Sequence, residues 1–163
     1  MTASRRFRPE LLAPLLHDLA AEDKFGEIPV RGTSMCPMLL HGDRVWLIPA
    51  KTEEIQVGDI VVRMGESGPI LHRVVGWWRV RDGWRILTKG DNVPRFDPPL
   101  RADCLIARVA ARVRHGQVRR LEGMGVRLRG RGRAAVSLTT GIVWEAWDRG
   151  RRATRRWLGL PGG

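Results

Sequence analysis

Three stretches of the chain hold residue types that can cleave peptide bonds by nucleophilic attack: one serine, one histidine and two aspartates. Ser34 lies in "RGTSMCPMLLHGD", His72 in "ILHRVVG", and Asp91 and Asp97 in "TKGDNVPRFDPP". A serine hydroxyl becomes a useful nucleophile only when a neighbouring base accepts its proton. A histidine serves as that base when a carboxylate holds its tautomer and stabilises the imidazolium. The three stretches therefore contain a candidate Ser–His–Asp set.

His72 is the best candidate for the base among the four histidines of the chain. It lies within an apolar run with strand character, where packing can fix the orientation of the ring. His17 falls on an expected helix, His41 on the serine loop and His115 at an expected hairpin tip. Structural roles stay open as the alternative: a turn residue for Ser34, a core residue for His72, and turn capping for the two aspartates.

The elements that must position these residues are mainly short β-strands. Residues 44–49 follow a Gly-Asp turn, and residues 58–64 begin with one. Both stretches are then rich in apolar or β-branched residues, a pattern typical of strands. Residues 25–31 predict a short strand before the serine loop. Arg81-Asp82-Gly83 and His115-Gly116 each separate two strand-like runs, and they predict hairpins over 70–90 and 105–122.

Both ends of the chain have a different character. Leucines between residues 11 and 19 recur with helical period and predict a short amphipathic helix within residues 1–25. Residues 124–133, "MGVRLRGRGR", alternate Gly and Arg and predict a linker or loop. Residues 137–158 predict a helix that is rich in arginine and tryptophan.

Membrane insertion and export receive no support from the sequence. No apolar run reaches the ~18 residues expected of a membrane-spanning helix, and Glu10, His17 and Asp18 interrupt any signal-peptide core. We therefore expect a cytoplasmic protein without an anchor. Two cysteines do not amount to a disulfide framework. Trp77, Trp78 and Trp84 fit either a membrane-dipping edge or cross-strand packing.

The net charge of +12 is concentrated in the C-terminal part of the chain. Residues 1–100 carry 14 Lys and Arg against 13 Asp and Glu, whereas residues 101–163 carry 15 against 4. Such a basic half suits nucleic acid, anionic lipid or an acidic peptide, and it is equally consistent with a solvated arginine-rich surface. The sequence shows no nucleic-acid-reading motif, and its first 25 residues are too short for a helix-turn-helix domain.

Five motifs in order give the chain a resemblance to type I signal peptidases and related serine peptidases. "GTSMCPML" with "HGDRVWL" resembles the nucleophile box of that family, although Met38 stands where threonine is usual. "GDIVV", "HRVVG", "TKGDN" and "LIARV" resemble the following four boxes, so the resemblance covers roughly residues 30–113. The nucleophile box matches at Ser34, Met35, Pro37, Leu39, Gly42 and Asp43.

The third box selects a subclass, because His72 stands where most bacterial members have a lysine. This resembles the Ser-His-Asp enzymes of archaea and the endoplasmic reticulum. The resemblance implies Ser34 as nucleophile, His72 as general base and then acid, and Asp97 as the residue that orients His72, with Asp91 as the alternative. It further implies that Met35 and Pro37 line the substrate site. Gly32 stands where many relatives have a serine that stabilises the oxyanion, so Thr33 is the remaining side-chain donor nearby.

The resemblance implies a mainly β, signal-peptidase-like fold of short antiparallel strands in a partly closed barrel, with a short N-terminal helix and a basic C-terminal helix. The expected parts are the N-terminal helix (1–25), the catalytic domain (26–122) and the basic segment with its helix (123–163). The expected function is a serine endopeptidase that cuts a protein or leader peptide after small residues, without cofactor or metal. The alternative is a non-catalytic or repressor-like module whose basic half binds nucleic acid or an anionic membrane.

Overall fold

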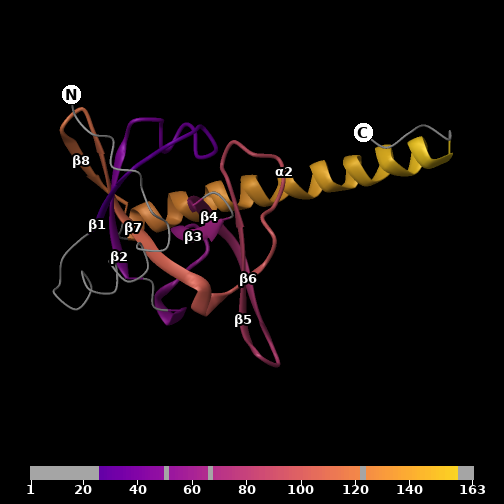
Figure 1. Cartoon of the computed structure of the whole chain (residues 1–163), viewed down its shortest axis with the longest axis horizontal. Helices are drawn as coiled ribbons and strands as arrows, with labels where there is room; N and C mark the ends of the chain where they lie inside the picture. The colour runs from indigo at the N-terminus through magenta and orange to yellow at the C-terminus, as the bar shows by residue number, and fades with distance from the viewer. Residues whose placement is uncertain (1–25, 50–51, 66–67, 122–123, 158–163) are drawn as a thin grey trace.

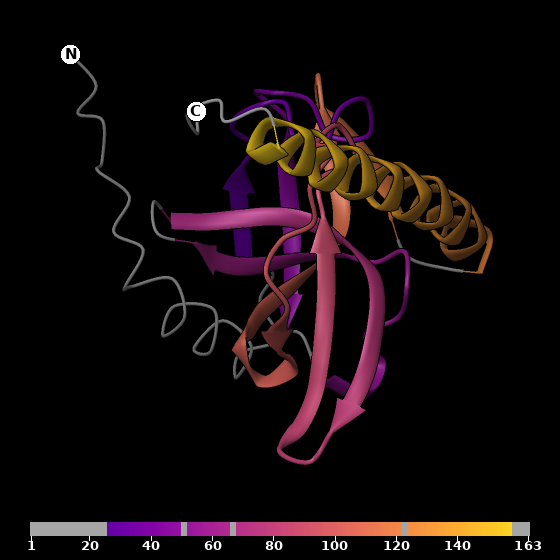
Figure 2. The same ribbon diagram turned by 90° about the vertical axis from the view of Figure 1, so that its right-hand side faces the viewer.

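An antiparallel sheet of eight strands forms the body of the protein, and one long helix lies across it (Figure 1 and Figure 2). The computed structural model describes residues 26–49, 52–65, 68–121 and 124–157. The mainly β architecture predicted from the strand-like runs is therefore confirmed. The helix expected within residues 1–25 lies outside the described residues.

The strands follow the predicted runs closely. Both predicted hairpins are present, and the second turns at His115 and Gly116, which both have positive φ. The order in the sheet is β1-β2-β7-β3-β4-β5-β6, with β8 paired to β7. The strands are β1 (Gly26–Pro29), β2 (Arg44–Pro49), β3 (Ile60–Gly65), β4 (Gly68–Val80), β5 (Gly83–Lys89), β6 (Leu100–Arg101), β7 (Leu105–Arg114) and β8 (Gln117–Arg120).

The sheet is open, which corrects the expectation of a partly closed barrel. Among the described strands, β1 and β6 are the two ends of the order and do not pair with each other. Only two residues of β6 pair with β5, too few to extend the sheet round to β1. The long β4 joins the two parts of the sheet, because its first half pairs with β3 and its second half with β5.

Apolar side chains are buried on both faces of the central strands. In β3, Ile60 and Val62 belong to one buried cluster and Val61 to the other, as the alternation of side chains along a strand requires. Met35 is only 3% exposed and belongs to the first cluster. Met35 therefore anchors the serine loop in the core, and its expected role in lining a substrate pocket stays a prediction.

Helix α2 (Met124–Trp157) includes the segment that the sequence predicted as a loop. Small residues at 130, 134, 137 and 141 recur at helical spacing and form the buried side of the helix. A Cβ at Gly130 would lie 2.9 Å from the carbonyl oxygen of Gly58, and one at Gly141 would lie 2.3 Å from the ring of Phe96. The glycines that made this segment look like a linker therefore let the helix approach the sheet closely.

The C-terminal part of α2 extends beyond the sheet (Figure 1). Val143 and Trp147 are exposed there, and the ring of Trp147 lies 5.0 Å from that of Trp144. No helix in the described part of the chain has both the length and the apolar character needed to cross a membrane. On the β4–β5 hairpin, the rings of Trp77 and Trp84 pack together at 4.4 Å, so cross-strand packing accounts for this pair.

The close approach of α2 gives a matched pair of glycine substitutions. Gly130→Ala should lower the free energy of unfolding by about 1–3 kcal/mol, because its methyl group meets the Gly58 backbone, which cannot swing aside. Gly132→Ala should raise it by about 0.5–1 kcal/mol, because that position is exposed and open and alanine favours a helix. Chemical denaturation measures both values. Stabilisation by both substitutions would contradict the docking of α2.

Candidate active site

His72 and Asp97 are joined by a short hydrogen bond. His72 lies in β4 and is 8% exposed, and its Nδ1 lies 2.6 Å from Asp97 Oδ2. Asp97 lies in the loop after β5, where its backbone N–H donates to the Thr88 carbonyl at 3.0 Å. The Thr88 hydroxyl also donates to Asp97 Oδ2, at 2.5 Å. Asp97 is thus held at the backbone and at the carboxylate, and it holds the imidazole ring in turn.

The surroundings of Asp97 favour its ionised form. Burial by itself would raise the pKa of this carboxyl, but the hydrogen bonds from His72 and Thr88 and the charge of Arg63 outweigh it, so the pKa lies below its usual value. Arg63 Nη1 lies 3.7 Å from Asp97 Oδ2. Because an ionised carboxylate only accepts hydrogen bonds, Nδ1 of His72 must carry the proton that joins the two residues. In the neutral ring the free lone pair is then on Nε2.

Asp91 has a different partner, which corrects the alternative that it orients His72. Its two carboxylate oxygens accept hydrogen bonds from Arg73 Nε and Nη2 at 2.7 and 2.6 Å. Arg73 is only 1% exposed, and its third guanidinium nitrogen donates to the Gly58 carbonyl at 2.7 Å. Asp91 therefore neutralises a buried arginine and braces the turn that follows β5.

The serine loop is tied to the same turn. The backbone N–H of Asn92 donates to the Ser34 carbonyl at 2.7 Å, and the Asn92 side-chain amide donates to the Thr33 carbonyl at 3.3 Å. A Cβ at Gly90 would lie 2.8 Å from the Ser34 carbonyl oxygen and 3.0 Å from His72 Nε2. The serine loop and the base therefore meet over Gly90, where any side chain would separate them.

Ser34 is half-buried beside this contact. Ser34 and His72 both lie in the described part of the chain, and no hydrogen bond joins Ser34 Oγ to His72 Nε2. Catalytic hydrogen bonds are often long in an unliganded site and tighten when substrate binds. The structure therefore brings the three predicted residues together, with the His–Asp contact formed and the Ser–His contact open.

The other candidate residues lie outside the His72–Asp97 contact, and the expectation that Pro37 lines the substrate site stays a prediction. Pro37 is exposed on the serine loop. His41 Nδ1 accepts a hydrogen bond from the Gly32 N–H at 3.3 Å, and His115 is exposed at the β7–β8 turn. His17 lies outside the described residues. Within the described ranges, no group of three His, Cys, Asp or Glu side chains could hold a metal ion.

One edge of β4 is free just before His72. Residues 68–72 pair with β3 only, and β5 joins the other side of β4 from Arg73 onward. Among the described strands this edge has no partner, so an extended peptide could add there by main-chain hydrogen bonds. This edge could not be predicted from the sequence, because it depends on the register of three strands. The roles of Thr88 and Gly90 could not be predicted either, although both residues lie within the "TKGDN" motif.

No protein-family model matches this chain, and no curated protein matches it. Support for a function therefore comes from the His72–Asp97 contact beside Ser34 and from the motifs in the sequence.

The pKa of Asp97 predicts a pH-dependent stability. A carboxyl whose pKa is lower in the folded than in the unfolded state stabilises the fold above the unfolded pKa, and this contribution is lost as the pH falls through the folded value. At neutral pH, Asp97→Asn should therefore unfold more easily than wild type. The difference should shrink as the pH falls below about 4. Denaturant titrations from pH 7 to pH 3 measure it, and a constant difference would contradict the assignment.

Proposed function

We propose that this protein is a serine endopeptidase in which Ser34 is the nucleophile, His72 the general base and Asp97 the residue that orients His72. The single observation that supports this proposal is the 2.6 Å hydrogen bond between His72 and Asp97, formed where the free His72 Nε2 faces the serine loop across Gly90. The motif resemblance to type I signal peptidases points to the same three residues.

In the proposed reaction, Ser34 Oγ attacks the carbonyl carbon of the scissile peptide while His72 Nε2 takes the hydroxyl proton. Asp97 stabilises the resulting imidazolium through Nδ1. His72 then gives the proton to the leaving amine, the C–N bond breaks, and an acyl-enzyme ester remains on Ser34. A water molecule attacks this ester with His72 again as base, which releases the acid product and restores the serine.

The developing oxyanion needs hydrogen-bond donors. The first is the backbone N–H of Ser34, which donates to no acceptor in the described part of the chain. Gly32 has no side chain to contribute, and the exposed Thr33, next to Ser34 in the sequence, is our candidate for the second donor. We therefore assign the first donor to the backbone and the second to Thr33.

The substrate in this proposal is an extended segment of a protein or leader peptide. It would pair with residues 68–72 at the free edge of β4, which leads its scissile bond toward His72. The resemblance to signal peptidases implies small residues such as alanine on the acyl side of the cut. No cofactor enters the proposed reaction.

Cleavage of a proteome-derived peptide library, with products identified by mass spectrometry, tests the proposal. Ser34→Ala and His72→Ala should abolish cleavage, and Asp97→Asn should lower kcat by about 10³–10⁴-fold, because the imidazole loses its correct tautomer. Asp82→Asn removes an exposed carboxylate on the β4–β5 hairpin and serves as the matched control with normal activity. Full activity of His72→Ala would refute the assignment.

A binding module is the competing class. Binding of DNA that weakens with salt and survives Ser34→Ala, in a protein that cleaves no library peptide, would favour this class.

Peripheral contact with an anionic membrane is a second proposal, supported by the outer side of α2. Val136, Val143 and Trp147 are exposed and recur on this side at helical spacing. Arg151 lies over the Trp147 ring at 5.1 Å, and the exposed Arg149 lies nearby in the sequence. An apolar stripe flanked by arginines suits the surface of an anionic bilayer.

Sedimentation with vesicles of phosphatidylglycerol and phosphatidylcholine measures this contact. Val143→Ser should weaken vesicle binding by about three- to tenfold, because one apolar anchor is lost. Val118→Ser removes the same side chain from β8, where Val118 is 50% exposed against 68% for Val143, and it should leave binding unchanged. Equal loss in both variants would count against α2 as the contact surface.

A further inference from the structure

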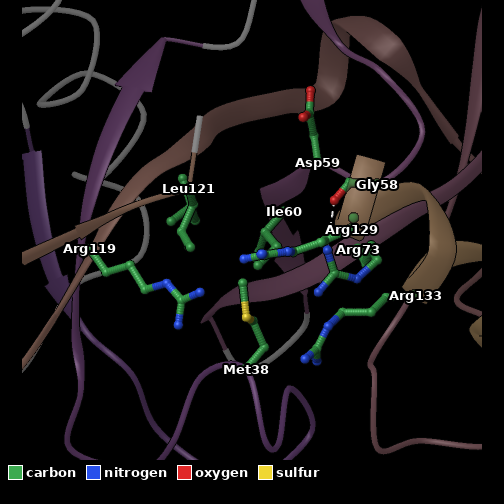
Figure 3. A pocket seen from close by; sticks show the side chains of 11 residues that line it. Met38, Gly58, Asp59, Ile60, Arg73, Arg119, Leu121, Arg129 and Arg133 are labelled. Atoms are coloured by element: carbon green, nitrogen blue, oxygen red, sulfur yellow. Dashed lines mark hydrogen bonds between the residues drawn. The ribbon is translucent and has the colours of Figure 1, made fainter. Parts of the chain in front are cut away.

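A small cavity lies between β8, the serine loop and the N-terminal part of α2. Its volume is about 80 Å³. Figure 3 shows the guanidinium group of Arg119 reaching in from β8, with Arg129 and Arg133 on the α2 side and Met38 beside them. Three positive side chains from two distant segments of the chain thus line one cavity.

These three arginines have no counter-ion in the described part of the chain. No described carboxylate forms a hydrogen bond or ion pair with Arg119, Arg129 or Arg133. Arg73 also lines the cavity, but Asp91 and the Gly58 carbonyl already engage its guanidinium group. Asp59 points away from the three guanidinium groups in Figure 3, and it accepts a hydrogen bond from the Gln56 N–H.

The N-terminal part of α2 adds further positive charge near this cluster and no acidic side chain. The N-terminal end of a helix carries a partial positive charge and is stabilised by anions. The first turn of α2 contains no acidic residue, and residues 124–133 contain four arginines and no Asp or Glu. The guanidinium groups of Arg119, Arg129 and Arg133 line the same cavity and repel one another, and a bound anion would relieve this repulsion.

We propose that this cavity is a binding site for a phosphate group. Guanidinium groups match phosphate oxygens through paired N–H donors. Three guanidinium groups suit a ligand with up to two negative charges and several oxygens better than a carboxylate, which has one charge and two oxygens. The site lies outside the proposed Ser34–His72–Asp97 set, so this inference does not depend on peptidase activity.

The phosphate group has two sources with the same chemistry, a small soluble phosphate and a lipid headgroup. Inorganic phosphate tests the first source in a thermal denaturation experiment at constant ionic strength, with chloride and acetate as reference anions. A phosphate concentration near ten times Kd should raise the midpoint by about 4 °C. Vesicles that contain phosphatidic acid test the second source, and inorganic phosphate should displace the protein from them if the headgroup occupies this cavity.

Arg119→Gln and Arg120→Gln form a matched pair for this test. Both remove one charge from an exposed residue of β8, but only Arg119 lines the cavity, because successive side chains of a strand point to opposite faces. Arg119→Gln and Arg129→Gln should each weaken phosphate binding about tenfold or more, whereas Arg120→Gln should bind like wild type. Equal weakening by Arg119→Gln and Arg120→Gln, or a midpoint shift from acetate equal to that from phosphate, would overturn the proposal.

Discussion

The close approach of three backbone segments at Gly90 is the constraint on which the candidate site depends. The serine loop, β4 with His72 and the turn after β5 meet there so tightly that a Cβ would lie within 3.0 Å of atoms from Ser34, Val93 and His72. Asn92 closes the contact by a hydrogen bond from its N–H to the Ser34 carbonyl. The proposed nucleophile and the proposed base are thus positioned mainly by the backbone.

Strand β5 joins this site to the long helix. Thr88 faces Asp97, and the next residue, Lys89, points toward α2, where its ammonium group donates to the Ser137 hydroxyl at 3.0 Å. Burial lowers the pKa of Lys89, although Asp91 and Asp97 oppose the shift. Small residues let α2 lie close to the sheet. The helix therefore covers the Lys89 ammonium group and is joined to β5 by the hydrogen bond to Ser137.

The arginines divide into two groups with different physical roles. Arg73 and Arg114 form paired hydrogen bonds with Asp91 and Asp43, and the bonds from Arg114 hold the pKa of Asp43 below its usual value. These pairs stabilise turns beside the strands. The arginines around the α2 cavity have no such carboxylates among the described residues, so their charge is available to a ligand. Because an aspartate balances each of these paired arginines, the net charge of +12 comes from cations outside such pairs.

Most strands could be predicted from the sequence, because β-branched runs and Gly-Asp turns are local signals, and the motifs placed Ser34, His72 and two candidate aspartates on three segments. The sequence motifs favoured Asp97 as the partner of His72 but left Asp91 open, since the two aspartates lie six positions apart in one turn-rich segment. The tertiary structure separated them, because Asp97 bonds to His72 and Arg73 engages Asp91. It also turned residues 124–133 from an expected loop into helix. The contact of Gly130 with Gly58 that accommodates this helix joins residues far apart in the chain, and no local pattern encodes it.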